Sequence, residues 1–194
     1  FNKSLIIVGG DVAISGMGIV QSVAMLILMP IFGINQGAQP IIGYNYGAGK
    51  YDRVIETLKL AIIAATAVVI VGFIVIQLFP GQIIGLFEEN PALVTFGSRA
   101  LRIFLVFLPI IGFQIVSANY FQAVGKPKHA MFLSLSRQVI ILIPAVLILP
   151  RFFALDGVLM ARPVSDLFSS LITGFWLWRE LKLLNRKHEL AQAS

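Results

Sequence analysis

The segment AIIAATAVVIVGFIVIQLF, residues 61–79, is nineteen residues long and contains no charged side chain. The hydrocarbon core of a bilayer is about 30 Å thick, and an α-helix needs about 20 apolar residues to cross it. The segment therefore predicts a transmembrane helix. A transmembrane β-strand would alternate apolar and polar residues over about ten positions. Residues 61–75 are apolar at nearly every position, so the pattern favours helices over a barrel.

The composition of the whole chain predicts an all-α integral membrane protein in a lipid bilayer. Of the 194 residues, 58% are hydrophobic and only 12% are charged, with a mean hydropathy of +0.90. A soluble domain carries about 25% charged residues, roughly twice as many. The net charge of +6 does not indicate a nucleic-acid partner, because the basic residues fall in short clusters between apolar runs. The chain contains no cysteine, so it has no disulfide and no thiolate chemistry.

Further apolar runs on both sides of residues 61–79 predict five complete membrane spans and the remnant of a sixth. The expected spans are 12–46, 54–79, 94–124, 129–149 and 157–179, with the remnant at 1–8 and a tail at 180–194. All of them belong to a single helical lobe. The chain begins inside an apolar run, so we interpret it as a piece of a longer protein.

The loops between these spans alternate in their content of lysine and arginine. The basic loops contain Lys50 and Arg53, Lys126 and Lys128, and, after the last span, Arg179, Lys182, Arg186 and Lys187. The other turns carry Glu88 with Glu89, and Arg151 with Asp156. The positive-inside rule places basic loops in the cytoplasm. We therefore expect a multi-pass protein of the inner (plasma) membrane with a cytoplasmic C-terminus.

Amide side chains are the unusual feature of the first complete span. Gln21, Asn35, Gln36 and Gln39 fall within an arc of about 100° on an ideal helix. Two prolines, Pro30 and Pro40, are expected to kink this helix. The amides either line a cavity for a substrate or an ion, or hydrogen-bond between packed helices. Gln114, the deepest amide of the third complete span, is a further candidate for the lining.

Arg137 and Asp166 are charges within predicted spans. A charge at the middle of a membrane costs about 2.5–3.5 kcal/mol on insertion scales, so each needs a partner or water. Their depths allow a pair between antiparallel neighbouring helices, although Arg162, one turn before Asp166, competes for the carboxylate. The two residues form either a structural ion pair or a site at which Asp166 binds a coupling ion.

The sequence contains no set of residues that indicates an enzyme. Its two histidines, His129 and His188, have no partner at metal-ligand spacing, so no metal site is expected. The segment GYNYGAGK, residues 43–50, ends like a phosphate-binding loop. Its spacing is one residue too long, and Tyr51 occupies the position of the required Ser or Thr. We expect no cofactor.

Four segments resemble one transporter family. The segment QGAQPIIGYNYGAGKYDRV, residues 36–54, resembles the second helix of the C-terminal lobe of multidrug and toxic compound extrusion (MATE) transporters. The segment NYFQAVGKP, residues 119–127, resembles the end of a helix before a short cytoplasmic turn of that lobe. SRQV at 136–139 with Ile143-Pro144 resembles the next helix, and residues 157–166 resemble the start of the last one.

This resemblance implies a twelve-helix transporter of two six-helix lobes, of which the chain is the C-terminal lobe without most of its first helix. The family exports cationic and amphipathic drugs in exchange for Na⁺ or H⁺ by alternating access. The implied partners are the N-terminal lobe of the same transporter and cationic or amphipathic small molecules. Some members carry a glutamate near the position of Gln36. An amide cannot bind and release a proton, so a coupling carboxylate is expected in the N-terminal lobe.

Two other functions remain open from the sequence. The chain could belong to a related exporter of polysaccharides or lipid-linked sugars, for which a strongly basic cavity would be expected. It could also be a non-transporting membrane subunit, in which the amides only join packed helices.

Overall fold

The structure, a computed structural model, describes residues 2–193, with side chains described over 12–153 and 156–189. Every element in the described range is a helix, as expected from the composition. In chain order the elements are α1 (Asn2–Gly47), α2 (Tyr51–Leu78), α3 (Pro80–Gly85), α4 (Pro91–Phe104), α5 (Leu108–Ala123), α6 (Pro127–Leu135), the π-helix η1 (Ser136–Leu142) and α7 (Ile143–Ala193).

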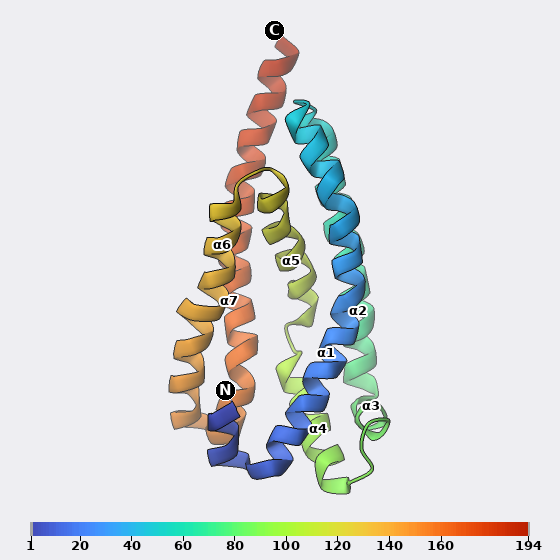
Figure 1. Cartoon of the computed structure of the whole chain (residues 1–194), viewed down its shortest axis with the longest axis vertical. Helices are drawn as coiled ribbons and strands as arrows, with labels where there is room; N and C mark the ends of the chain where they lie inside the picture. Colours follow the sequence, from blue (N-terminus) through green and yellow to red (C-terminus); the bar gives the residue numbers. More distant parts are fainter. Residues whose placement is uncertain (1, 194) are drawn as a thin grey trace.

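The helices form an elongated bundle with α5 at its centre (Figure 1). α1 and α2 lie side by side along one flank, while α6, η1 and α7 form the other. α5 contacts both groups, because it packs on α1 and α2 on one side and on α6 and α7 on the other. The contact between α5 and α7 contains several of the buried polar residues that are described below.

The chain reverses direction within α7. In a straight α-helix, residues 149 and 157 would be about 12 Å apart along the axis. Here a Cβ atom on Gly157 would collide with the carbonyl group of Leu149, and it would lie 2.7 Å from the nitrogen of Pro150. The segments before and after this point therefore run antiparallel, and Figure 1 shows the reversal at the lower end of the bundle. The reversal lies where the sequence places the turn between spans 129–149 and 157–179.

Two helices end in the same glycine-dependent turn. Gly49 follows α1 and Gly125 follows α5, and both have φ of 72°. In each turn the next residue donates its N–H to a carbonyl five residues earlier: Lys50 to Asn45 at 2.9 Å and Lys126 to Phe121 at 2.8 Å. This is the Schellman motif, which favours glycine because only glycine adopts a positive φ without strain.

The predicted span 94–124 is not one straight helix. It consists of α4 and α5, which are bent by 53° at a short break. Pro109 lies in the first turn of α5 and has no N–H to donate to the carbonyl of Leu105. The break therefore falls one turn before the proline. The short helix α3, between α2 and α4, was also not predicted.

By length and composition, three described segments can cross a membrane: Val12–Gly47, Tyr51–Leu78 and Pro127–Phe153. The bent pair α4 and α5 makes a fourth if it is one span. The part of α7 after Asp156 is less apolar than these segments, because it carries charged and hydroxyl side chains among its apolar residues. It nevertheless runs beside the other helices along the bundle (Figure 1).

α2 shows how the bundle divides its surface between packing and lipid. Its inner face combines Val, Leu and Ile residues with the two alanines Ala61 and Ala65, and a Cβ atom on Gly112 of α5 would lie 3.0 Å from the backbone of Ala65. Small residues of this kind allow close approach of helix backbones in membranes. Its outer face exposes Leu60, Ile63, Ile70, Val71, Ile74, Val75 and Leu78. This apolar outer face suits hydrocarbon.

Candidate functional site

Arg137 and Asp166 form an ion pair in the interior of the bundle. Arg137 Nε donates to Asp166 Oδ1 at 2.9 Å, and Arg137 Nη2 lies 2.7 Å from the same oxygen. Asp166 is only 1% exposed. Ser165 Oγ adds a second link by donating to the carbonyl oxygen of Arg137 at 2.7 Å. α7 therefore binds both the side chain and the backbone of this arginine.

The backbone around Arg137 is a π-helix, Ser136–Leu142. A π-helical turn is wider than an α-helical turn and shifts the backbone hydrogen bonds by one residue. Such segments occur frequently at functional sites in helices. Arg137 lies in this widened turn. There its carbonyl oxygen accepts a hydrogen bond from Ser165, and its guanidinium donates to Asp166.

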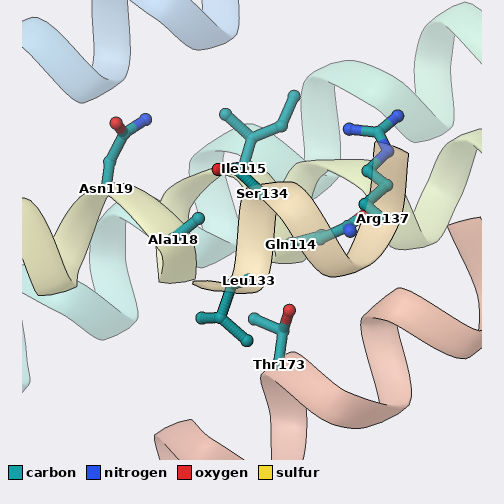
Figure 2. Close-up of a pocket in the computed structure, with 8 residues that line it drawn as sticks. All are labelled: Gln114, Ile115, Ala118, Asn119, Leu133, Ser134, Arg137 and Thr173. Atoms are coloured by element: carbon teal, nitrogen blue, oxygen red, sulfur yellow. The ribbon is translucent and has the colours of Figure 1, made fainter. Parts of the chain in front are cut away.

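Gln114 lies on the central helix α5 and contacts α7 at Ser169, one turn after Asp166. Its Nε2 donates to Ser169 Oγ of α7, while its Oε1 has no partner among the described residues. Thr173 Oγ1, also on α7, is buried and likewise has no partner there. Both residues line a cavity of about 160 Å³ between α5, α6, η1 and α7 (Figure 2). A polar cavity of this size has room for several water molecules, which would satisfy both atoms.

Two larger cavities continue this polar interior. One, of about 400 Å³, is lined by Arg137, Gln138, Leu142, Arg162, Ser165 and Asp166. The other, of about 450 Å³, is lined by Gly18, Gln21, Ser22, Ala24, Met25, Leu28, Phe104 and Arg162. The first cavity shares Arg137 with the second, and the second shares Arg162 with the third. We call this series the polar seam; its residues are Gln21, Gln114, Arg137, Arg162, Ser165, Asp166, Ser169 and Thr173.

The amides of α1 do not act as one group. Asn35 is 7% exposed and turns into the bundle, where its Nδ2 has no partner among the described residues. Gln21, Gln36 and Gln39 are exposed, and Gln21 lines the third cavity of the seam. Asn35 and Gln36 are consecutive, so their side chains leave the helix about 100° apart and meet different surroundings.

Pro30 and Pro40 lie on the exposed side of α1, and the helix continues through both. The two prolines therefore do not interrupt the helix.

The hydroxyl groups of α7 were not predicted as part of the site. Ser165, Ser169 and Thr173 are buried and recur every four residues, so they lie on one face of the helix. This spacing is visible in the sequence and would have indicated a polar face. Asp166 lies beside this face.

A second buried carboxylate, Glu180, lies farther along α7. It pairs with Lys126 in the turn after α5, and Tyr120 of α5 donates its hydroxyl to the same oxygen at 3.4 Å. These contacts join α5 to α7 near the end of the bundle where the C-terminus lies (Figure 1). Among the described residues, no group of three or more histidines and carboxylates is arranged to hold a metal ion.

An all-helical bundle with apolar outer faces and a polar seam inside is typical of membrane proteins that bind polar groups in their interior, as transporters do. The comparison with known families identifies the family. The family model MatE matches residues 3–147, three quarters of the chain, so the chain belongs to the MATE family of transporters. The resemblance noted in the sequence is thereby confirmed.

Individual relatives agree with the family match. The chain is 28% identical over 182 residues to "Probable multidrug resistance protein YpnP" of Bacillus subtilis (strain 168), covering 92% of the chain and 41% of YpnP. It is 24% identical over 166 residues to "Multidrug export protein MepA" of Staphylococcus haemolyticus (strain JCSC1435), covering 86% of the chain and 36% of MepA. The chain therefore spans about two fifths of the length of these relatives.

Solved structures of the family share the fold. A structure of the MATE multidrug transporter DinF-BH, solved as a complex, is 42% identical, with a TM-score of 0.80 over 90% of this chain and 39% of that one. A crystal structure of MATE in the bent conformation has a TM-score of 0.89 over 97% of this chain and 42% of that one. The latter is 20% identical and shows the fold alone.

Proposed function

We propose that the chain is the C-terminal lobe of a twelve-helix transporter that exports cationic or amphipathic compounds in exchange for Na⁺ or H⁺. The lobe would contribute five complete spans and the remnant of a sixth, and it would alternate between outward-open and inward-open states together with an N-terminal lobe. The names of YpnP, MepA and DinF-BH support multidrug export. The share of their length that the chain covers supports one lobe out of two.

The observation that carries this proposal is the exposed face of α1. Gln21, Gln36 and Gln39 are exposed on a helix that is long and apolar enough to span a membrane. Large amides do not face hydrocarbon, because lipid offers no hydrogen-bond partner. This face would therefore line a water-filled cavity shared with the N-terminal lobe.

The same face offers adaptable apolar contacts. Met25, Met29 and Phe32 are exposed on α1 between the glutamines. Methionine side chains are flexible and polarizable, so they adjust to ligands of different shape. An amphipathic compound would place its apolar part against these residues and its polar groups near the amides.

Ion coupling would depend on the N-terminal lobe. Asp166 is buried and bound to Arg137, so in this lobe we assign it a structural role. Gln36 is neutral and can accept no proton. A carboxylate that releases a proton or Na⁺ during the cycle would therefore lie outside this chain.

The arrangement of the turns supports the proposed orientation in the membrane. The turns after α1 and after α5 and the C-terminus lie toward one end of the bundle, whereas α3 and the reversal within α7 lie toward the other (Figure 1). The first group contains the basic clusters. By the positive-inside rule this end would face the cytoplasm from the inner membrane.

The family match does not favour the two alternatives raised by the sequence, an exporter of lipid-linked sugars and a non-transporting subunit.

Dye efflux from cells that express the full-length transporter tests the proposal. We expect lower accumulation of a fluorescent cationic dye than in cells with an empty vector. A Na⁺ gradient or a proton uncoupler would change this efflux, according to the coupling ion. Gln36→Leu should reduce efflux several-fold without lowering the protein level, whereas Gln82→Leu, an exposed amide on the short helix α3, should not. Dye accumulation equal to that of the empty vector would refute the antiporter function.

A further inference from the structure

The polar seam has an unbalanced charge. It contains two guanidinium groups, those of Arg137 and Arg162, and one carboxylate, that of Asp166. At neutral pH the three side chains carry a net charge of +1. A charge in the interior of a membrane protein needs a partner or water.

The ion pair already uses the single carboxylate. Both close contacts of Arg137 end on Asp166 Oδ1. Among the described residues, no carboxylate oxygen lies within the 4.0 Å ion-pair distance of Arg162, although Asp166 is one turn away. The guanidinium of Arg162 instead lies over the ring of Phe104, with its central carbon 5.2 Å from the ring centroid.

The aromatic ring does not balance the charge of Arg162. A cation–π contact contributes about 0.5–2 kcal/mol. Complete removal of an ion from water costs several kcal/mol even after relaxation of the protein, and partial removal costs a share of this. Arg162 is partly buried, so an anion beside it would offset more of this cost than the ring does.

The surroundings of Arg162 have space and hydrogen-bond donors for an anion. Arg162 lines both larger cavities of the seam, of about 400 and 450 Å³. Gln138 lines the cavity of about 400 Å³ with it, and Gln21 lines the cavity of about 450 Å³; each amide has an NH₂ group that can donate to an anion. The positive charge of Arg137 adds to the attraction, and Asp166 opposes it.

We propose that Arg162, flanked by Gln21 and Gln138, binds a monovalent anionic group in these cavities. The chemistry fits chloride or the carboxylate of a small organic acid. The site is distinct from a coupling-cation site, because a net charge of +1 repels Na⁺. This proposal does not depend on which compounds the transporter exports.

Equilibrium binding of radiolabelled chloride to the full-length transporter in lipid nanodiscs tests the proposal. We expect saturable binding at a single site. Arg162→Gln should weaken binding at least about tenfold, which corresponds to the loss of one charge-assisted hydrogen bond. Arg151→Gln removes the same charge from an exposed arginine outside the seam and should leave binding unchanged.

A second variant should change the affinity for chloride in the opposite direction. Asp166→Asn raises the net charge of the seam to +2. In the fraction of this variant that stays folded by size-exclusion chromatography, chloride should bind more tightly, whereas a cation site would lose its binding. Arg162→Lys keeps the charge without the planar fork and should bind several-fold more weakly than the wild type, so it provides a test if Arg162→Gln does not fold. Competition by acetate would show that the site also accepts carboxylates, and its absence would assign the site to inorganic anions. The proposal is refuted by a lack of saturable binding, by wild-type affinity in Arg162→Gln, or by weaker binding in the folded fraction of Asp166→Asn.

Discussion

The buried pair of Arg137 and Asp166 leads to a quantitative prediction about stability. Removing one partner of a buried ion pair costs about 3–5 kcal/mol, because the other charge stays buried without compensation. In Arg137→Met the carboxylate of Asp166 keeps Arg162 one turn away, so we expect a loss near 3 kcal/mol. In Asp166→Asn Arg137 loses its ion-pair partner and Arg162 loses the negative charge one turn away, so we expect a loss near 5 kcal/mol.

The double variant Arg137→Met/Asp166→Leu separates the pair from the rest of the protein. It removes both charges and fills the site with apolar groups, a change that is often neutral. We therefore expect the double variant to be more stable than Asp166→Asn. Reversible unfolding in detergent, followed by the fluorescence of Trp176 and Trp178 on α7, measures the free energies. Single variants that each cost less than about 1 kcal/mol, the value of an exposed pair, would refute the structural role. A double variant whose loss equals the sum of the losses in Arg137→Met and in Asp166→Leu would refute the coupling between the two residues.

Three further predictions concern packing, the cavity and a turn. Gly112→Ala should destabilise the chain by about 1–3 kcal/mol because its Cβ atom would crowd the α2 backbone, whereas Gly33→Ala, with no atom within 4 Å, should stabilise it by about 0.5–1 kcal/mol. Equal effects of the two substitutions in detergent unfolding would argue against this packing. Gln114→Leu should change stability by less than about 1 kcal/mol, since it removes an unpaired oxygen together with the bond to Ser169. It should nevertheless lower dye efflux, and unchanged efflux would exclude this cavity from the transport path. Gly125→Ala should cost about 1–2 kcal/mol because of its φ of 72°, and Gly125→Asn should cost less; the same unfolding assay compares them.

The amides of α1 show which part of the site could be predicted from the sequence and which part could not. The helical wheel places Gln21, Asn35, Gln36 and Gln39 within an arc of about 100°. It does not say how the helix is rotated in the bundle. The structure turns Asn35 inward and leaves the three glutamines exposed, because the small and apolar residues beside Asn35 pack against other helices.

The pairing of charged side chains in the interior could not be predicted from the sequence alone. From the sequence, Asp166 had two possible partners, Arg137 on a neighbouring helix and Arg162 one turn away. The π-helical turn and the hydrogen bond from Ser165 place Arg137 against the carboxylate. The shared cavities around Arg162 bring α1 and η1 to the same arginine, although they are about a hundred residues apart.

The sequence by itself determined the helical class, the lipid environment and the positions of most turns. These properties follow from transfer free energies that add along a continuous segment, and from local backbone preferences such as those of Gly49 and Gly125. Only the tertiary structure decided the bend between α4 and α5, the pairing of Arg137 with Asp166, and the polar seam. Each of these depends on the distance between side chains of different helices, and helix packing sets that distance independently of hydropathy.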